Sequence, residues 1–327
     1  MINREKRTQS GPLLEVDIYP VWSDGRRVPT REPKSKVTSA AQQRYNDEQA
    51  VKRIVRLVNA NFDKTDYWMH PTYFQDTAPQ DEQQARRDLV NYIRRVRDRR
   101  KKALQEAKEQ LKATWAALDV IAQNTVERGR RNEKLAQMHL EDQVRDLKKR
   151  VKKLNKPLKY VYVIERQTYK TGKRAGLANW HFHLFISGGL DDKTMEALWQ
   201  QGVRVNCDNY QPDRFGPEAA ARYMSKDPQG ARRWSCSRNL TKPAEKTRDG
   251  KYTRRQVERI ATQRVDEAAW WEKQYPGYRF LRCFSRYNEY NSNWYVTAVM
   301  YKTDQPAPAW LDQWSVSDRG DGDDGEK

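Results

Sequence analysis

The feature that most limits how this chain can fold is a highly charged helical run over residues 101–154. On both sides of its midpoint, apolar residues recur at alternating four- and three-residue steps: Leu111, Trp115, Leu118, Leu140, Val144, Leu147, Val151 and Leu154. The segment "ERGRRNE" around Gly129 interrupts the run. The pattern predicts an antiparallel helical hairpin, with arms about 35 Å long at the usual helical rise. We interpret it as a spacer or partner surface, so chemistry must be sought elsewhere.

The segments on either side of this hairpin alternate between helical and strand patterns. An amphipathic helix is expected in "DEQQARRDLVNYIRRVRDRRKK", with its apolar face at Ala85, Leu89, Tyr92, Ile93 and Val96. The β-forming segments are "TDYWMHPTYF", "LKYVYVIERQ", "NWHFHLFISGG", "VRVNCDNY", "YRFLRCFSRY" and "NWYVTAVMYK". Residues 1–50 are expected to form an N-terminal arm leading into a helix, and residues 303–327 an acidic disordered tail. The order of elements predicts an α+β fold with helices packed on an antiparallel sheet.

The charge of the chain indicates a polyanionic partner. Of its 327 residues, 63 are Lys or Arg and 44 are Asp or Glu, and the net charge is +19. The basic residues gather in clusters such as "RDRRKK" and "KKRVKK", which is typical of proteins that bind nucleic acid. No apolar run of spanning length and no signal peptide is present, so we expect no membrane partner and a cytoplasmic protein. The three cysteines stand far apart, without the spacing of a disulfide framework or zinc ribbon.

Two of the four histidines stand one residue apart in "NWHFHLFISGG". In a strand, His181 and His183 project from one face while Phe182 and its alternate neighbours line the other. Two imidazoles presented in this way suit a divalent metal, although paired structural histidines are an equally open reading. A hairpin with the preceding strand can bring Glu165 beside them, and Gln167 could take its place. Nitrogen and oxygen ligands of this kind suit Mn²⁺ or Mg²⁺.

A candidate nucleophile follows some forty residues later in "FGPEAAARYMSKD", where Pro217 favours a helix start. Tyr223 and Lys226 then lie one turn apart on the same helical face. A phenol has a pKa near 10, so its attack on phosphorus needs a nearby cation, which Lys226 could supply. Taken alone, this pair is more often a packed tyrosine with a solvated lysine. Basic residues flanking the constellation are the predicted DNA contacts: Lys170, Lys173, Arg174, Arg232, Arg233, Arg238 and Lys242.

Taken together, "HFH" on a strand and "YMSK" on a helix resemble the paired motifs of the HUH endonucleases. In particular, they resemble the single-tyrosine rolling-circle replication initiators of bacterial plasmids and phages. The segments "VNANF", "LKYVYVIERQ" and "RRWSCSRNLTKP" also resemble parts of those proteins, over roughly residues 35–100 and 155–300. One departure is the first strand, where His70 and Pro71 replace the usual Thr- and Leu-rich motif. Ala219 and Asp227 flank Tyr223 at four residues, so a two-tyrosine mechanism is not supported.

The resemblance implies a five-stranded antiparallel sheet flanked by helices, with a metal bound by the two histidines and a third polar ligand. It also implies that Tyr223 cuts a DNA strand, retains the 5′ phosphate and releases a 3′ hydroxyl. The implied organisation is a catalytic domain over residues 51–100 and 155–230, the hairpin 101–154 as an insertion, and a C-terminal part of the catalytic region over residues 231–302.

The leading hypothesis from the sequence is a metal-dependent, sequence-specific DNA nicking and joining endonuclease that starts rolling-circle replication. Its substrate would be single-stranded DNA or a hairpin origin. No GxxxxGK[ST] motif occurs in the chain, so a host helicase is an implied partner. The alternatives are a non-catalytic DNA- or RNA-binding protein, and a transposase or relaxase with the same chemistry.

Overall fold

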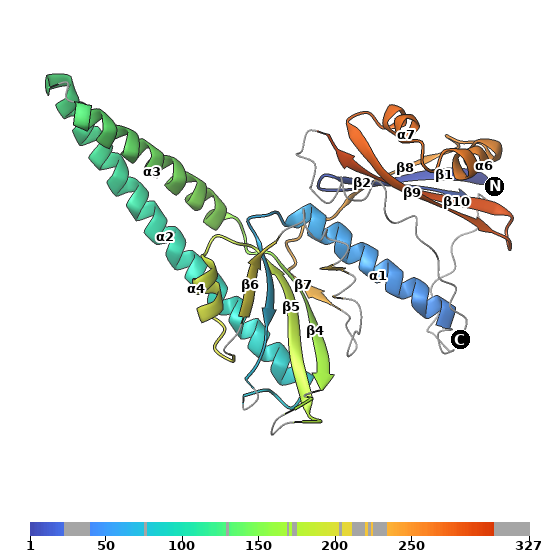
Figure 1. The fold of residues 1–327 in the computed structure, drawn as a ribbon, viewed down its shortest axis with the longest axis horizontal. Coiled ribbons are helices and arrows are strands. Elements are labelled where there is room, and N and C mark those ends of the chain that lie inside the picture. Colours follow the sequence, from blue (N-terminus) through green and yellow to red (C-terminus); the bar gives the residue numbers. More distant parts are fainter. Residues whose placement is uncertain are drawn as a thin grey trace. The chain divides into compact units, whose positions relative to one another are not determined.

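The computed structural model describes residues 1–22, 40–74, 77–128, 131–168, 170–171, 175–202, 205–210, 220–221, 224 and 234–303. The described residues fall into two compact units, each with its own five-stranded antiparallel sheet and its own apolar core. The two units are considered separately below (Figure 1). The α+β class expected from the sequence is confirmed, but the single expected sheet is wrong because the strands divide between two sheets.

The first unit joins the two ends of the described chain in one sheet. Its strand order is β8-β1-β2-β10-β9, and all neighbours are antiparallel. The elements of this unit are β1 (Ile2–Ser10), β2 (Leu13–Val21), α1 (Ala40–Asn61), β8 (Ala244–Asp249), α6 (Arg254–Gln263), α7 (Ala268–Gln274), β9 (Tyr278–Asn288) and β10 (Asn293–Lys302). Side chains from α6 and α7 pack with one face of the sheet around Trp271, which is fully buried.

The N-terminal arm expected over residues 1–50 is wrong for its first half, because residues 2–21 form the hairpin β1–β2. The inward positions of β1 are polar, among them Asn3, Glu5 and Thr8, so the strand carries no hydrophobic alternation that a sequence pattern could reveal. Tertiary contacts satisfy the buried carboxylate instead. Glu5 accepts hydrogen bonds from Lys251 and Tyr275, at 2.5 Å in each case.

The second unit contains most of the segments between residues 62 and 240. Its sheet has the antiparallel order β6-β3-β5-β4-β7. The elements are β3 (Tyr67–Pro71), α2 (Glu82–Arg128), α3 (Arg131–Asn155), β4 (Tyr160–Thr168), β5 (Ala178–Ile186), α4 (Asp192–Ala197), β6 (Val205–Asn209) and β7 (Ser235–Cys236). Pro71 ends β3, which lies between β6 and β5 and is therefore an inner strand. The hairpin expected from β4 and β5 is present, with Val163 opposite His183 and Glu165 opposite His181.

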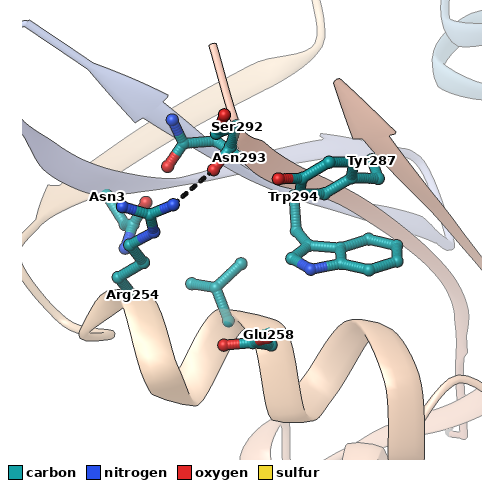
Figure 2. A pocket seen from close by; sticks show the side chains of 8 residues that line it. Asn3, Arg254, Glu258, Tyr287, Ser292, Asn293 and Trp294 are labelled. Carbon is teal, nitrogen blue, oxygen red and sulfur yellow. Dashed lines mark hydrogen bonds between the residues drawn. The ribbon is translucent and has the colours of Figure 1, made fainter. Parts of the chain in front are cut away.

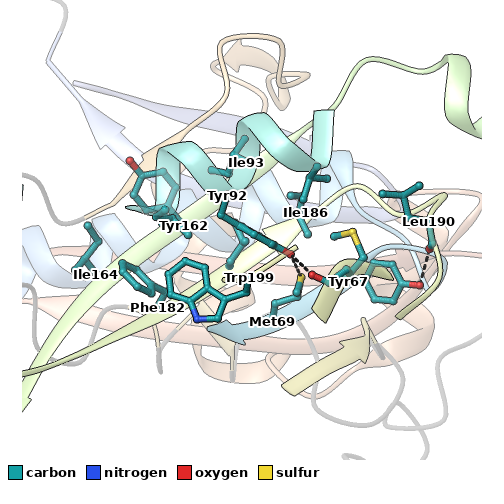
Figure 3. Packing of buried hydrophobic residues seen from close by; sticks show 14 of the residues in the cluster. Tyr67, Met69, Tyr92, Ile93, Tyr162, Ile164, Phe182, Ile186, Leu190 and Trp199 are labelled. Atoms are coloured by element: carbon teal, nitrogen blue, oxygen red, sulfur yellow. Dashed lines mark hydrogen bonds between the residues drawn. The ribbon is translucent and has the colours of Figure 1, made fainter. Parts of the chain in front are cut away.

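One face of this second sheet is covered by the first part of α2 (Figure 3). The whole apolar face expected for this helix is buried: Ala85, Leu89, Tyr92, Ile93 and Val96. It packs on Phe182 and Leu184 from β5, which alternate with the histidines along that strand. The Tyr92 hydroxyl donates to the carbonyl oxygen of Met195 at 3.1 Å, so even the polar end of this side chain is satisfied within the core. The histidines consequently lie on the opposite face.

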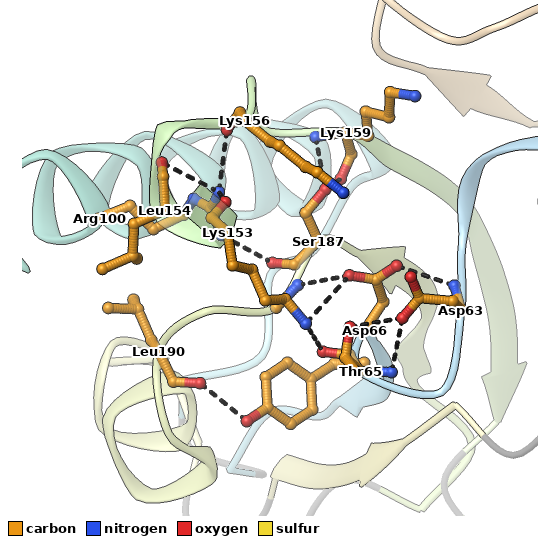
Figure 4. Close-up of polar contacts among 12 residues, drawn as sticks. Asp63, Thr65, Asp66, Arg100, Lys153, Leu154, Lys156, Lys159, Ser187 and Leu190 are labelled. Atoms are coloured by element: carbon orange, nitrogen blue, oxygen red, sulfur yellow. Dashed lines mark hydrogen bonds and ion pairs between the residues drawn. The ribbon is translucent and has the colours of Figure 1, made fainter. Parts of the chain in front are cut away.

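The helical hairpin is formed by α2 and α3, which end and begin on either side of the interruption expected around Gly129. The amphipathic helix and the first arm are one continuous helix of 47 residues, about 70 Å long at the usual rise. The two helices lie side by side (Figure 1). At the base of the hairpin the buried Arg100 guanidinium donates to backbone carbonyls of Lys153, Lys156 and Ser187, at 3.0 to 3.4 Å (Figure 4). Lys153 contacts Thr65 and Asp66 ahead of β3.

These contacts place the root of the hairpin in the second unit's core. Ala103, Ala107 and Leu154 are buried there, although the hairpin's outer part is largely exposed. No helix among the described residues is long and apolar enough to cross a membrane.

Candidate metal centre

Three of the four histidines and one carboxylate gather on the face of the second sheet that α2 does not cover. They come from adjacent strands: His70 from β3, His181 and His183 from β5, and Glu165 from β4. The β3–β5 register pairs Met69 with Leu184, and a backbone bridge pairs Thr72 with His181. The same register sets His70 beside His183. Strand pairing alone therefore brings these four side chains together.

His183 is the centre of the group and is 4% exposed. Its Nε2 lies 2.8 Å from a carboxylate oxygen of Glu165, and its Nδ1 lies 2.9 Å from Nδ1 of His70. An ionised carboxylate can only accept, so Nε2 of His183 donates to Glu165. In a neutral imidazole the other nitrogen then accepts, so Nδ1–H of His70 donates to Nδ1 of His183. The chain of hydrogen bonds runs from His70 through His183 to Glu165.

His181 is placed differently from its neighbour. It stands opposite Glu165 in the β4–β5 register, but its Nε2 is buried and has no hydrogen-bond partner among the described atoms. A buried ring nitrogen without a partner is costly in a folded protein. A bound cation is one group that would satisfy it.

Aromatic rings flank the histidines on the same face. The Trp68 ring stacks on His183 at 6.0 Å between centroids and meets the edge of His70 at 4.8 Å. Phe185 packs against Trp68 at 4.2 Å. These rings remove water from one side of the imidazoles, which lowers the local dielectric and strengthens their electrostatic interactions.

All three imidazoles are held in the neutral form. Burial lowers the pKa of His70 to about 4, and positive charge on the other two histidines opposes its protonation further. Burial also lowers the pKa of His181 and of His183, and the opposing attraction of Glu165 does not outweigh it. Burial alone would raise the pKa of Glu165, but hydrogen bonds with His183 and Gln167 keep it below its usual range. At neutral pH the group offers neutral nitrogens and an ionised carboxylate, the protonation states that bind metals.

The donor set fits a divalent cation in its chemistry, since imidazole nitrogen with carboxylate oxygen suits Mn²⁺ and related ions. As they stand, however, the donors face one another in pairs. Among the described residues no three His, Cys, Asp or Glu side chains converge as a ready set of ligands. A cation would replace the hydrogen bonds from His183 to His70 and to Glu165.

The other sequence-predicted site residues are distributed unevenly over the structure. Gln167 is exposed at the end of β4, beyond Glu165. Lys170, Arg238 and Lys242 are exposed as expected of DNA contacts. The remaining predicted residues lie outside the described part of the chain: Tyr223, Lys226, Lys173, Arg174, Arg232 and Arg233.

His70 is the site residue that the sequence reasoning treated only as a departure from a family pattern. A usable signal was present, because Trp68, His70 and Thr72 alternate along a strand, so one imidazole and one large ring share a face. What the sequence lacked was the pairing partner. Only the antiparallel β3–β5 register sets His70 next to His183.

A small cavity in the first unit offers no comparable chemistry (Figure 2). It encloses about 60 Å³ beside α6, and among its lining residues Arg254 donates to the carbonyl oxygen of Ser292 at 2.6 Å. Pockets that hold small molecules are about 300–1,000 Å³, so this one is too small for a nucleotide.

Comparison with known protein families gives a match over part of the chain. Residues 124–228 match the family model of the replication-associated protein ORF2. The matched segment includes α3, β4 and β5, and therefore Glu165, His181 and His183; β3, with His70, lies before it. No curated protein and no solved structure matches the chain. The match supports a replication protein of the Rep type, which implies binding to DNA.

Proposed function

We propose that this protein is a metal-dependent, sequence-specific DNA nicking and joining endonuclease that initiates rolling-circle replication. The observation that carries the proposal is the group of neutral imidazoles and one carboxylate on adjacent strands. Two of these strands lie within the segment matched to a replication-associated family. His181, His183 and Glu165 would hold Mn²⁺ or Mg²⁺, with His70 as a further ligand or as the group that orients His183. The bound cation would supply Lewis-acid polarisation of a phosphate oxygen.

Tyr223 is the proposed nucleophile. Its hydroxyl oxygen would attack the scissile phosphorus in line with the bond to the 3′ oxygen, and the 5′ phosphate would stay on Tyr223 as a phosphotyrosine. The released strand leaves with a 3′ hydroxyl that can prime synthesis. Lys226 would stabilise the phenolate or the charge on the phosphate. Attack by a 3′ hydroxyl on the phosphotyrosine reverses the step and joins the strands.

The geometric demand of this attack favours single-stranded DNA or a hairpin extruded at the origin. A host helicase would then separate the duplex ahead of synthesis, since the chain carries no P-loop motif. A non-catalytic DNA-binding protein would share the basic charge but would leave no covalent product.

Replacing Tyr223 by phenylalanine tests the nucleophile. The Tyr223→Phe variant keeps the ring and loses only the hydroxyl, so DNA affinity should survive while cleavage and the covalent adduct disappear. Intact-mass spectrometry after incubation with a pool of single strands and Mn²⁺ measures the adduct. Tyr290→Phe is the matched control, because Tyr290 is 99% exposed in the β9–β10 turn and plays no part in the proposed chemistry. An adduct on the Tyr223→Phe variant contradicts the assignment.

Metal removal tests the second half of the proposal. Chelation with EDTA should abolish cleavage, and added Mn²⁺ should restore it. His181→Ala and His183→Ala should each raise the Mn²⁺ concentration needed for cleavage or remove activity. Equal cleavage rates with EDTA and with Mn²⁺ would rule out the metal mechanism.

A further inference from the structure

A basic groove lies at the base of the helical hairpin, in the second unit. It has a volume of about 590 Å³ and is bounded by α2, by the end of α3 with the segment that leads into β4, and by the residues after β7. The described lining residues are Arg97, Arg100, Lys101, Leu104, Leu154, Asn155, Lys156, Pro157, Leu158, Tyr160, Ser237, Arg238 and Asn239. Five of these are cationic and none is acidic, in a chain where acids make up 44 of 107 charged side chains.

The cations of this groove divide into one structural residue and four exposed ones. Arg100 is buried, and its guanidinium is used by the backbone carbonyls at the hairpin base (Figure 4). Arg97, Lys101, Lys156 and Arg238 are exposed. Like charges gathered around one cavity repel one another, and a bound anion relieves that repulsion.

Tyr160 lies among these charges at the start of β4. Burial raises the pKa of its hydroxyl, while the positive charges of Arg97 and Arg238 oppose this change, so both guanidiniums lie within electrostatic range of the ring. Amide side chains of Asn155 and Asn239 add polar groups at the rim. Cations, amides and an aromatic ring in one open groove are the groups that hold a nucleic-acid backbone.

The groove is separate from the histidine group. Tyr160 packs with the core on the side of the sheet that α2 covers, whereas His183 and Glu165 lie on the other side. Its cations come from helices and connecting segments and not from the strands that carry the histidines. A ligand here would therefore bind without contacting the candidate metal centre.

We infer that this groove binds the phosphodiester backbone of DNA at a second site, away from the histidines. The inference rests on the proposed function only for the identity of the ligand as DNA. Among the four exposed cations, only Arg238 was a predicted DNA contact from the sequence. Arg97, Lys101 and Lys156 are assigned by the groove itself.

The test is a charge-removal triple variant of the full chain, Arg97→Gln, Lys101→Gln and Arg238→Gln, with Arg100 left intact. The matched control removes three exposed cations from the first unit, Arg255→Gln, Arg259→Gln and Lys273→Gln, and so lowers the net charge by the same amount. Fluorescence anisotropy with labelled single-stranded and duplex DNA in EDTA measures Kd at several salt concentrations. The absence of metal keeps cleavage out of the measurement.

The groove variant should bind DNA about tenfold or more weakly, and the slope of log K against log salt should fall by about 2 to 3, because each lost phosphate contact removes about 0.7 for single strands and 0.9 for duplex. The control should stay within about threefold of the wild type. A larger loss for one form of DNA identifies which form occupies the groove. Equal losses in groove variant and control would mean that net charge alone acts, and would overturn the inference.

A second variant separates lost charge from lost structure. The Arg97→Lys and Arg238→Lys double variant keeps both charges, so its affinity should stay near that of the wild type, and a loss equal to that of the triple variant would also overturn the inference. The outcome is independent of nicking. Groove-dependent binding by a protein that never cleaves DNA would contradict only the proposed function, and nicking with groove-independent binding would contradict only this inference.

Discussion

At the scale of single residues, the candidate metal centre depends on neutral imidazoles in a partly dry setting. Burial disfavours the protonated form of each histidine, and Glu165 does not restore it. His183 joins His70 to Glu165 through both of its ring nitrogens, so its orientation is fixed by two neighbours. A residue that fixes a ligand's orientation commonly affects metal affinity almost as much as the ligand itself.

His70→Asn should therefore weaken Mn²⁺ binding by about 10- to 100-fold. The variant keeps a polar side chain on β3 but removes the imidazole that contacts His183. Calorimetric titration with Mn²⁺ measures the change. His139→Asn on α3 is the control, because that histidine contacts Gln143 on its own helix. Unchanged Mn²⁺ affinity in the His70→Asn variant would leave His70 a purely structural role.

A second prediction concerns Glu5 in β1, whose side chain is almost fully buried. Burial alone would raise its pKa, but hydrogen bonds from Lys251, Tyr275 and Arg7 hold the pKa below the usual value of about 4.3. A carboxyl with a lowered folded-state pKa stabilises the fold above its unfolded-state pKa, and this contribution is lost as pH falls through the lower folded-state value. The free energy of unfolding should therefore fall in acid, below about pH 4.

The Glu5→Gln variant removes this charge while keeping the shape of the side chain. It should lower the free energy of unfolding at neutral pH by about 2 kcal/mol, the usual value of hydrogen bonds to a charged group. Its acid dependence should be flatter than that of the wild type. Denaturant unfolding followed by circular dichroism at several pH values measures both effects, and parallel pH curves for the two proteins would contradict the prediction.

At the scale of elements, the helical hairpin has two parts with different roles. Its root contributes Ala103, Ala107 and Leu154 to the core, and Arg100 ties the root to the segment before β4 and to Ser187. Its outer part is mostly exposed, with a shallow seam in which Lys148 lies over the Trp115 ring at 4.7 Å. The hairpin as a whole is thus more than a spacer attached to a finished domain.

Removing only the outer part should leave the fold and the proposed chemistry in place. We expect a protein lacking residues 116–143, with Trp115 joined to Val144 through a short glycine linker, to bind Mn²⁺ and nick DNA as the full chain does. Removing residues 101–154 should instead unfold the second unit, since it deletes buried core side chains. Thermal unfolding and Mn²⁺ titration distinguish the two. Loss of Mn²⁺ binding in the shorter deletion would show that the outer part supports the site.

At the scale of the whole molecule, two sheets with two cores replace the single sheet expected from the sequence. The core of the first unit centres on Trp271, and that of the second on residues such as Leu89 and Phe182. The candidate metal centre belongs entirely to the second unit. Damage to one core should therefore be separable from damage to the other.

Trp271→Ala should destabilise the first unit by about 3–5 kcal/mol, through lost burial and the cavity left behind. Mn²⁺ affinity should be retained, because the histidines lie in the other unit. Leu89→Ala should have the converse effect, destabilising the second unit and weakening Mn²⁺ binding near its unfolding temperature. Scanning calorimetry with Mn²⁺ titration checks both, and identical calorimetric and metal-binding losses for the two variants would contradict independent cores.

The sequence by itself determined the elements whose signals are local. The helical hairpin, the apolar face of α2 and the hairpins β4–β5 and β9–β10 all follow from spacing within one segment, and so does the shared face of His181 and His183. The β4–β5 hairpin also brought Glu165 within reach, because its partner strand is the next one along the chain.

Tertiary structure decided what depends on partners far apart in the chain. The polar strand β1 forms because β2 and β8 pair with it and because Lys251 and Tyr275, from the far end of the described chain, satisfy Glu5. His70 joins the histidine group through a pairing that spans 113 residues. Neither pairing leaves a periodic trace in its own segment, since the free energy that selects it comes from contacts made only after the chain has folded.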